Sequence, residues 1–274
     1  MRRLIGVGVG PGDPELVTVK AVRVLKQADV VAVPVLAAPG GGPAGDDAAA
    51  APPGRAEAVV REYIDASRIR RVPFALNETG GLTRRRESAW DAAASVLARA
   101  FADGAATIAF GTIGDPSLYS TFSYLAQTVR TMVRGVSVET VPGITAMQDL
   151  AARSAAVPGG GAALAEGSEP LMLLPLTAGA GALRDALARP GTVVGYKLGS
   201  AAGPSPGEIA GLLAAAGRLD GAVVGSRLGL AGQDIRPAAA LADLGAVPYL
   251  STLVVPARRD GRGSGLRPQA GGAT

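Results

Sequence analysis

The sequence contains no cysteine and no histidine. The missing cysteine excludes disulfides, thiolate nucleophiles and thiolate metal sites. The missing histidine removes the commonest general base, excludes Ser-His-Asp hydrolysis and takes away the usual ligand of transition metals. Carboxylates, tyrosines, lysines and arginines are therefore the titratable side chains left for chemistry, and we expect no metal site.

Long apolar runs are missing as well. None approaches the roughly 18 residues that a membrane-spanning helix needs, and no basic leader precedes an apolar segment. We therefore interpret the chain as a cytoplasmic protein without a membrane partner. Its 274 residues are 48% hydrophobic but only 4% aromatic, which is enough for two modest domains with substantial cores.

Lysine is scarce, and arginine carries most of the net charge of +4. Arginine binds carboxylates and phosphates through two parallel hydrogen bonds, so the excess favours an anionic partner, with codon usage as the alternative explanation. The basic stretch at residues 83–86 is short and has no interleaved aromatic residues. Nucleic acid is therefore not an expected partner.

One stretch, residues 110–121, organises the chain. It follows an apolar run at residues 105–109 that predicts a buried strand, and Gly111 and Gly114 permit backbone angles closed to other residues. Pro116 suits the opening turn of a helix. Loops at the carboxyl ends of strands bind ligands in α/β proteins, and Asp115 would suit a ligand that carries a cation or hydroxyls. An ordinary tight turn is the alternative.

A similar strand, turn and helix begin the chain. An apolar strand at residues 4–9 leads into Gly8-Val9-Gly10-Pro11-Gly12-Asp13-Pro14, and a helical face follows with Leu16, Val19, Val22 and Leu25. A phosphate loop is excluded, because no Lys-Ser/Thr pair follows the glycines. A dinucleotide fingerprint is disfavoured, because Pro11 breaks its pattern and the next strand, at residues 30–35, ends without an acid.

The rest of the first half alternates between strands and helices. Residues 37–56 are Ala, Gly and Pro with few charges, which predicts a flexible insertion. The expected elements after it are a helix at 57–66, a strand at 69–73, a helix at 87–102 that buries Trp90, Ala94, Leu97 and Phe101, a helix at 118–132, and a strand at 136–141. This alternation predicts a mainly parallel sheet with helices on both faces. Three glycine-bearing strand ends, near residues 10, 111 and 142, should then converge.

The second half is also predicted to be α/β. Its expected elements are helices at 144–154, 182–188 and 208–216 and strands at 171–174, 192–196, 221–225 and 249–255, with a loop at 158–161 and a hairpin or loop within 226–248. We expect an N-terminal α/β domain over residues 1–143, a C-terminal α/β domain over 144–256 and a disordered tail over 257–274.

Four segments together resemble the tetrapyrrole (corrin/porphyrin) methylase family. They are Gly8-Val9-Gly10-Pro11-Gly12-Asp13, Gly114-Asp115-Pro116, Val141-Pro142-Gly143-Ile144-Thr145 and Tyr196-Lys197, and they span nearly the whole chain in order. Residues 112–121, 196–199 and 248–253 are most similar to the branch that methylates C-20 of precorrin-2 in cobalamin biosynthesis. The insertion at 37–56 and the stretch at 201–206 depart from the family's pattern.

The resemblance implies a fold, a cofactor and an assembly. The fold is two α/β domains of the tetrapyrrole methylase type with S-adenosylmethionine (SAM) in the cleft between them, and the assembly is a homodimer. The cofactor contacts carried over by motif are Pro11, Ile113, Gly114, Asp115, Leu118, Thr145, Ala146, Tyr196, Lys197 and Leu228. For Thr145 and Ala146 a plain helix N-cap is the alternative, and for Tyr196 a core aromatic.

The implied reaction is methyl transfer from SAM to C-20 of precorrin-2, a polycarboxylate tetrapyrrole, giving precorrin-3A. The meso carbon is electron-rich, so alignment of the reactants can carry catalysis without a strong base. No catalytic residue is assigned: Tyr119, Glu87, Asp91, water and a substrate carboxylate are all open as the final proton acceptor. Arg84, Arg85, Arg86 and Arg153 are candidates for binding the substrate's carboxylates, with solvated surface positions as the alternative.

The sequence is compatible with three other functions. The first keeps the enzyme class but takes a cobalt-bearing substrate of the anaerobic pathway, which has the same carboxylate rim as precorrin-2, or methylates another ring carbon. A member of the same superfamily that modifies RNA or protein would show salt-dependent binding to RNA or to a translation factor. A SAM-sensing domain would bind SAM and turn over no tetrapyrrole.

Overall fold

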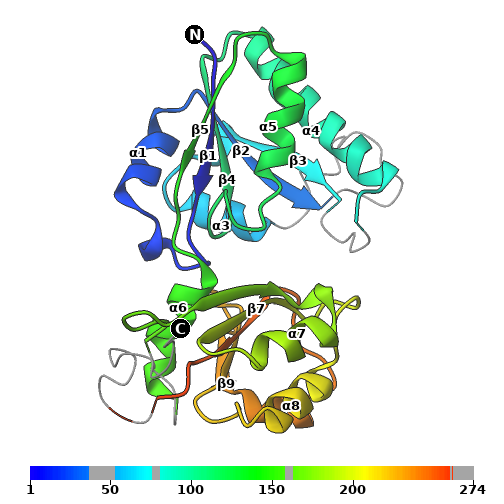
Figure 1. Ribbon diagram of the computed structural model, residues 1–274. Helices are drawn as coiled ribbons and strands as arrows, with labels where there is room; N and C mark the ends of the chain where they lie inside the picture. Colours follow the sequence, from blue (N-terminus) through cyan, green and yellow to red (C-terminus); the bar gives the residue numbers. More distant parts are fainter. Residues whose placement is uncertain (37–52, 76–80, 158–162, 260, 262–274) are drawn as a thin grey trace, which may run out of the picture. The chain divides into compact units, whose positions relative to one another are not determined.

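A computed structural model describes residues 1–36, 53–75, 81–157, 163–259 and 261. Contacts within the chain group it into two compact units, Met1–Thr145 (unit 1) and Ala146–Thr274 (unit 2). Each unit holds a five-stranded sheet with helices packed against it, as Figure 1 shows. The expected α/β class is confirmed.

Unit 1 is built on a parallel sheet. Its strands lie in the order β3-β2-β4-β1-β5, and every neighbouring pair is parallel. The strands are β1 (Arg3–Gly8), β2 (Val30–Leu36), β3 (Ile69–Phe74), β4 (Thr107–Thr112) and β5 (Ser137–Val141). The helices are α1 (Val19–Gln27), α3 (Arg55–Arg61), α4 (Arg84–Ala102) and α5 (Phe122–Met132), with short 3₁₀ turns at Pro14–Leu16 and Ala66–Arg68.

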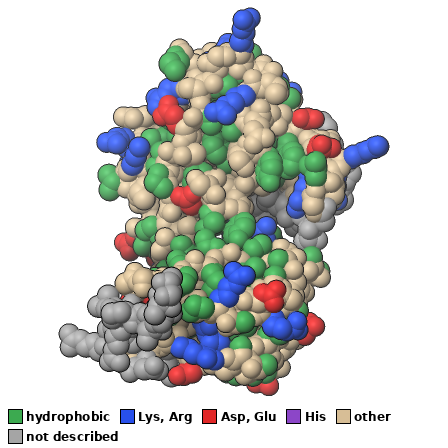
Figure 2. All heavy atoms as spheres, in the orientation of Figure 1, with side chains coloured by type: hydrophobic (Ala, Val, Ile, Leu, Met, Phe, Trp, Pro, Cys, Tyr) green, Lys and Arg blue, Asp and Glu red, His purple; other side chains and the backbone are tan. Residues whose placement is uncertain are grey.

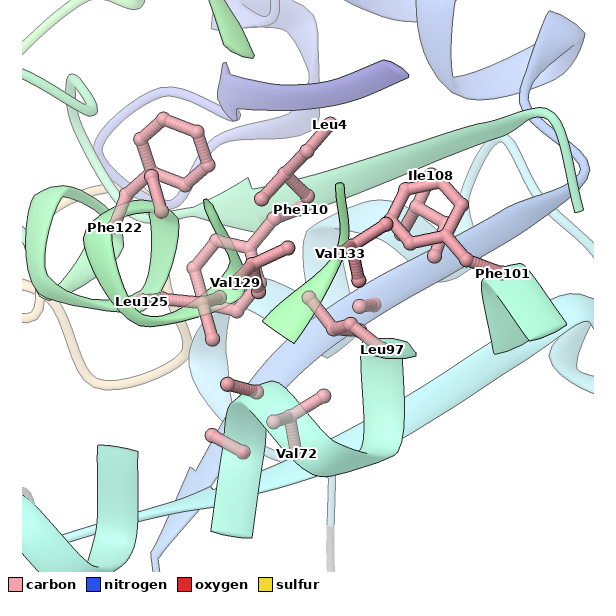
Figure 3. Packing of buried hydrophobic residues seen from close by; sticks show 14 of the residues in the cluster. Leu4, Val72, Leu97, Phe101, Ile108, Phe110, Phe122, Leu125, Val129 and Val133 are labelled. Carbon is pink, nitrogen blue, oxygen red and sulfur yellow. The ribbon is translucent and has the colours of Figure 1, made fainter. Parts of the chain in front are cut away.

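The two faces of this sheet carry separate cores. Side chains alternate along a strand, so Leu4 faces the helices α4 and α5 while Ile5 faces α1 and α3. Figure 3 shows the first of these cores, where Leu97 and Phe101 of α4 and Phe122 and other residues of α5 meet strand residues such as Phe110. The expected arrangement, a parallel sheet with helices on both faces, is confirmed.

Unit 2 is built on a mixed sheet in the order β6-β7-β10-β8-β9. Only β6 and β7 pair in parallel, and the other neighbours are antiparallel. The strands are β6 (Leu171–Pro175), β7 (Thr192–Leu198), β8 (Val223–Ser226), β9 (Asp234–Pro237) and β10 (Ser251–Val255). The helix α6 (Ala146–Arg153) packs on one face, and α7 (Ala180–Leu187) and α8 (Pro206–Ala215) pack on the other. The gap at 226–248, where a hairpin or loop was expected, contains β9, which pairs with β8 in an antiparallel hairpin.

Several helix boundaries differ from the expectation. The helix expected from residue 118 begins only at Phe122, and the one expected over 57–66 ends at Arg61. The helix expected from residue 87 begins at Arg84, so the three arginines at 84–86 form its first turn rather than precede it. Val19 was expected on one helix face with Leu25, yet Val19 is 85% exposed in the first turn of α1 whereas Leu25 is buried.

Two segments expected to be flexible are partly ordered. Arg55 and Ala56 fall in the predicted insertion yet begin α3, and Ala56 is buried. In the predicted tail, the Ala257 N–H donates to Thr192 Oγ1 at 2.9 Å, and Arg259 pairs with Glu169 at 2.6 Å. The rest of the insertion, residues 37–52, the loop expected at 158–161 and residues 262–274 lie outside the described residues. Of the helices that are described, none combines the length and apolar character needed to cross a lipid bilayer.

Candidate functional site

The carboxyl ends of β1, β4 and β5 form a single edge in unit 1. These strands are neighbours in register, with Gly8 opposite Thr112 and Val7 opposite Val141. The turns that leave them carry Gly8, Gly10, Gly114 and Gly143, which we call the glycine edge. The predicted convergence of three glycine-bearing strand ends is therefore confirmed within unit 1.

Glycine is required in this edge because the turns touch backbone to backbone. A Cβ built on Gly143 would lie 2.1 Å from the carbonyl oxygen of Gly114, and one built on Gly8 would lie 2.6 Å from the Gly143 nitrogen. The Gly114 N–H donates to the Gly10 carbonyl at 2.8 Å, with both residues at positive φ. The turns are thus locked together, and a side chain at either contact would force them apart.

The space beside Gly114 differs from that around Gly8 and Gly143. A Cβ on Gly114 would meet no atom within 4 Å. Its φ of +69° disfavours any other residue, so this glycine is required by conformation and leaves an open surface next to its peptide groups. A ligand can approach the backbone here without displacing a side chain.

Asp115 fixes the position of this loop. Its Oδ1 accepts the Ser117 N–H at 2.7 Å, and its Oδ2 accepts the Gly143 N–H at 2.9 Å. The carboxylate therefore joins the turn after β4 to the turn after β5. The sequence analysis predicts that the Asp115 charge faces a ligand, and the structure shows that the carboxylate also holds two turns together. Each oxygen keeps a second lone pair, so these bonds are compatible with a ligand contact.

The loop from Pro116 to Thr121 delays the start of α5. Ser120 Oγ lies 3.2 Å from Thr112 Oγ1 and accepts the Phe122 N–H at 3.1 Å, so it binds the first turn of the helix to the end of β4. Tyr119 has a φ of +51°, an unfavourable angle for a tyrosine. Its side chain is 44% exposed. Backbone strain of this kind gathers at functional sites.

Unit 2 brings together its own set of predicted residues. The Tyr196 hydroxyl accepts the Met147 N–H at 3.2 Å, in the first turn of α6. Leu228 belongs to the core cluster around Leu150, and Ala146 and Tyr196 pack against that cluster. The packing of Tyr196 agrees with the core-aromatic alternative, and its contact with SAM stays a prediction.

The remaining predicted residues are placed as follows. Pro11 is buried beside Gly10, and Ile113 and Leu118 are half-buried in the loop around Gly114. Thr145 is buried at the end of unit 1 and Ala146 begins unit 2. Lys197 has a φ of +62° near the end of β7. The cofactor contacts themselves stay predictions.

A model of the tetrapyrrole (corrin/porphyrin) methylase family matches residues 3–244. The chain belongs to this family. The match runs through both units and includes all four segments that carried the resemblance, so the tetrapyrrole methylase assignment made from the sequence is confirmed.

Curated relatives of this tetrapyrrole methylase carry related names. A precorrin-2 C(20)-methyltransferase from Sinorhizobium is 34% identical over 181 residues, 64% of this chain and 64% of that protein. A cobalt-precorrin-2 C(20)-methyltransferase from Salmonella typhimurium is 31% identical over 153 residues, 56% of each chain. A protein of Methanocaldococcus jannaschii, named probable cobalt-precorrin-2 C(20)-methyltransferase, is 34% identical over 64% of each chain. The chain thus matches less than two thirds of the length of these relatives.

Solved structures share the fold. A cobalt-precorrin-4 methyltransferase superposes with a TM-score of 0.61 at 18% identity, covering 93% of this chain and 94% of the other. A uroporphyrin-III C-methyltransferase from Thermus thermophilus, in complex with S-adenosylhomocysteine, gives a TM-score of 0.55 at 23% identity, covering 92% of this chain and 96% of the other. At these identities the likeness establishes the fold of the tetrapyrrole methylase chain.

Some features of the site had no clear signal in the sequence. The bond between Asp115 and Gly143 joins residues 28 apart, and no local sequence pattern predicts it.

A surface hollow of about 600 Å³ lies against α1 and Tyr63, and none of the predicted cofactor contacts lines it. Within the described ranges, no group of three or more carboxylates is placed to hold a metal ion.

Proposed function

We propose that this chain methylates C-20 of precorrin-2 with SAM as the methyl donor, giving precorrin-3A in cobalamin biosynthesis. The observation that carries the proposal is the agreement of several curated relatives on one position: each is named for methylation at C(20), and two are 34% identical to this chain. Membership of the tetrapyrrole methylase family supports the wider substrate class.

The glycine edge suits SAM by its chemistry. SAM presents a sulfonium, an ammonium, a carboxylate and a ribose, which backbone N–H and C=O groups can satisfy without a metal. The open space beside Gly114 gives access to such groups, and the Asp115 carboxylate supplies a fixed negative charge next to them. We propose Pro11, Ile113, Gly114, Asp115, Leu118, Thr145, Ala146, Tyr196, Lys197 and Leu228 as the residues in contact with SAM.

When bound, SAM supplies an activated methyl group on sulfur. The protein's task is then to hold the donor and the electron-rich meso carbon in line and to keep water away. Holding two reactants in a near-attack geometry can account for about 7–11 kcal/mol of barrier lowering. The locked backbone of the glycine edge fits this task, because a rigid surface loses little freedom when it binds. A chain without histidine or cysteine can carry out such a reaction.

A cobalt-bearing substrate is the second candidate, favoured by a specific observation. The relatives from Salmonella typhimurium and Methanocaldococcus jannaschii are named for cobalt-precorrin-2, whereas the Sinorhizobium relative is named for precorrin-2. Identities of 31–34% do not separate the two groups. We propose precorrin-2 as the first candidate substrate. We also propose that the protein forms a homodimer and is located in the cytoplasm.

The deciding experiment supplies both substrates. Purified protein is incubated with SAM and with precorrin-2 or cobalt-precorrin-2 generated in situ, and the products are followed by mass and absorbance. The proposal expects one added methyl group on precorrin-2 and formation of S-adenosylhomocysteine. A faster reaction with cobalt-precorrin-2 would make the cobalt-bearing ring the preferred substrate. No mass gain on either substrate, with normal binding of S-adenosylhomocysteine, would end the proposal and leave a SAM-sensing role.

A role on RNA or protein substrates has less support. A diphthine synthase shares the fold with a TM-score of 0.55 at 14% identity, a likeness that carries no functional argument. Binding to RNA or to a translation factor that weakens with salt would favour this alternative.

A further inference from the structure

An aromatic pair joins α4 to α5 on the surface of unit 1. The rings of Trp90 and Tyr124 are stacked, with centroids 4.4 Å apart and planes 7° apart. Trp90 packs partly against the core beneath α4, whereas Tyr124 keeps 47% of its surface exposed. The pair, which we call the aromatic platform, thus stacks a partly buried ring on an exposed one.

The pair lies towards the end of the sheet that carries the glycine edge. In a parallel sheet with crossover helices, the helix that follows a strand begins at that strand's carboxyl end. Helix α4 follows β3 and α5 follows β4, and the loop that enters α5 holds Gly114 and Asp115. Tyr124 is the third residue of α5 and Trp90 the seventh of α4, so both lie within about 10 Å of a helix start at 1.5 Å per residue.

Other exposed apolar side chains gather at the same helix ends. Leu82 precedes α4 and is 69% exposed, and Tyr119 lies in the loop before α5. Figure 2 shows hydrophobic side chains among polar ones on the face of unit 1 that carries α4 and α5. A cluster of exposed apolar groups rimmed by polar residues is typical of a binding surface.

The charge at the start of α4 is mixed with a positive balance. Arg84, Arg85 and Arg86 form the first turn, and the acids Glu87 and Asp91 follow on the same helix. The Arg86 guanidinium donates to the Gly81 carbonyl, so part of this basic group already supports the helix start. The positive end of the helix dipole adds to the cationic side.

We infer that this surface holds the face and the carboxylate rim of the tetrapyrrole: the conjugated ring stacks against Tyr124, backed by Trp90, and Arg84 binds a carboxylate at the ring's edge. The inference rests on the proposed function, since it names residues that bind its substrate. A flat conjugated ring with acidic side groups matches an open aromatic platform with a basic border. The residues proposed to contact SAM are separate from these.

Four variants test the inference as two matched pairs. Tyr124→Ala removes the platform, and Met132→Ala removes an exposed apolar side chain from the far end of the same helix. Arg84→Gln removes the basic border, and Arg99→Gln removes one positive charge from the far end of α4. Each protein is titrated with uroporphyrin III, a stable tetrapyrrole that carries eight carboxylates, and with S-adenosylhomocysteine, and is assayed for the KM of precorrin-2.

We expect Tyr124→Ala to raise the Kd of uroporphyrin III and the KM of precorrin-2 about tenfold, with kcat and the Kd of S-adenosylhomocysteine within twofold of wild type. Arg84→Gln should raise both about threefold and reduce their dependence on salt. The two far-end variants should behave as wild type. If Tyr124→Ala fails to fold, the Arg84 pair decides the matter alone.

Two results would overturn the inference. One is unchanged uroporphyrin III binding and an unchanged KM in both Tyr124→Ala and Arg84→Gln. The other is a change of oligomeric state in Tyr124→Ala without a change in tetrapyrrole binding, which would assign the pair to an interface between copies of the chain. If wild type leaves precorrin-2 unmethylated while uroporphyrin III binding still depends on Tyr124, the proposed function fails and the substrate surface stands.

Discussion

Gly143→Ala is the sharpest perturbation of the glycine edge. The added methyl carbon would lie 2.1 Å from the Gly114 carbonyl oxygen and 2.8 Å from the Gly8 Cα, and both are backbone atoms that no rotamer change can move. The turns must separate, which stretches the 2.9 Å bond from the Gly143 N–H to Asp115. Overpacking costs about 1–3 kcal/mol, and a hydrogen bond to a charged group contributes about 1.5–3 kcal/mol. We expect a loss of about 3 kcal/mol in the free energy of unfolding.

Thermal unfolding followed by circular dichroism measures this loss. For a chain of this size, 3 kcal/mol corresponds to a fall in Tm of about 6–12 °C. Because the displaced turns carry the proposed contacts, calorimetry should also show binding of S-adenosylhomocysteine weakened at least about tenfold. The matched control is Gly211→Ala in the middle of α8, where a Cβ meets no atom within 4 Å, and we expect it to gain about 0.5–1 kcal/mol. A Gly143→Ala protein with wild-type Tm and affinity would refute the close packing of the turns.

Three further predictions follow from other contacts. Asp115→Ala should weaken the binding of S-adenosylhomocysteine about tenfold, measured by calorimetry. The substitution removes both the negative charge and the carboxylate bonds that fix the loop. An unchanged affinity would show that the loop does not bind the cofactor. Arg218 is 5% exposed and donates to four backbone carbonyls. Arg218→Met should therefore lower the free energy of unfolding in urea by about 3 kcal/mol. A loss below about 1 kcal/mol would contradict a stabilising role for these bonds. The hydrogen bond from Arg259 holds the pKa of Glu169 below its ordinary value of 4.5. The ion pair between these residues therefore stabilises the fold fully at pH values above 4.5. Its contribution is lost as the pH falls below 4.5 and Glu169 becomes protonated. Glu169→Gln should accordingly have a lower free energy of unfolding than wild type at neutral pH. Acidification to about pH 3 should reduce its free energy of unfolding by less than it reduces that of wild type. Equal reductions in the two proteins would contradict a stabilising ion pair between Glu169 and Arg259.

The sequence predicted the strands of unit 1 well, because each is a short apolar run between turn residues. It placed the start of α5 too early. Pro116 is compatible with a helix start, but the side chains of Asp115 and Ser120 bind backbone groups that a helix beginning at residue 118 would rearrange. The same two side chains also contact other strand ends, Asp115 at the Gly143 N–H and Ser120 at Thr112, and a local pattern does not describe such contacts. The local prediction therefore failed at the loop that carries several of the proposed SAM contacts.

The tail and the second sheet show a similar limit. Residues 257–259 have a composition that predicts disorder, yet Arg259 forms an ion pair with Glu169, 90 positions away. The antiparallel pairing of β10 with β7 and β8 likewise had no signal in the spacing of elements. Contacts between residues far apart in the sequence decide both cases, whereas the convergence of glycine-bearing turns followed from parallel topology alone.

The position of the transferred methyl group tests the account most directly. SAM labelled with ¹³C in its methyl group is incubated with the protein and freshly made precorrin-2, and the product is examined by ¹³C NMR. We expect a single labelled methyl group, bonded to the meso carbon C-20. A label on another ring carbon, or an unlabelled tetrapyrrole despite bound SAM, would contradict the proposed function.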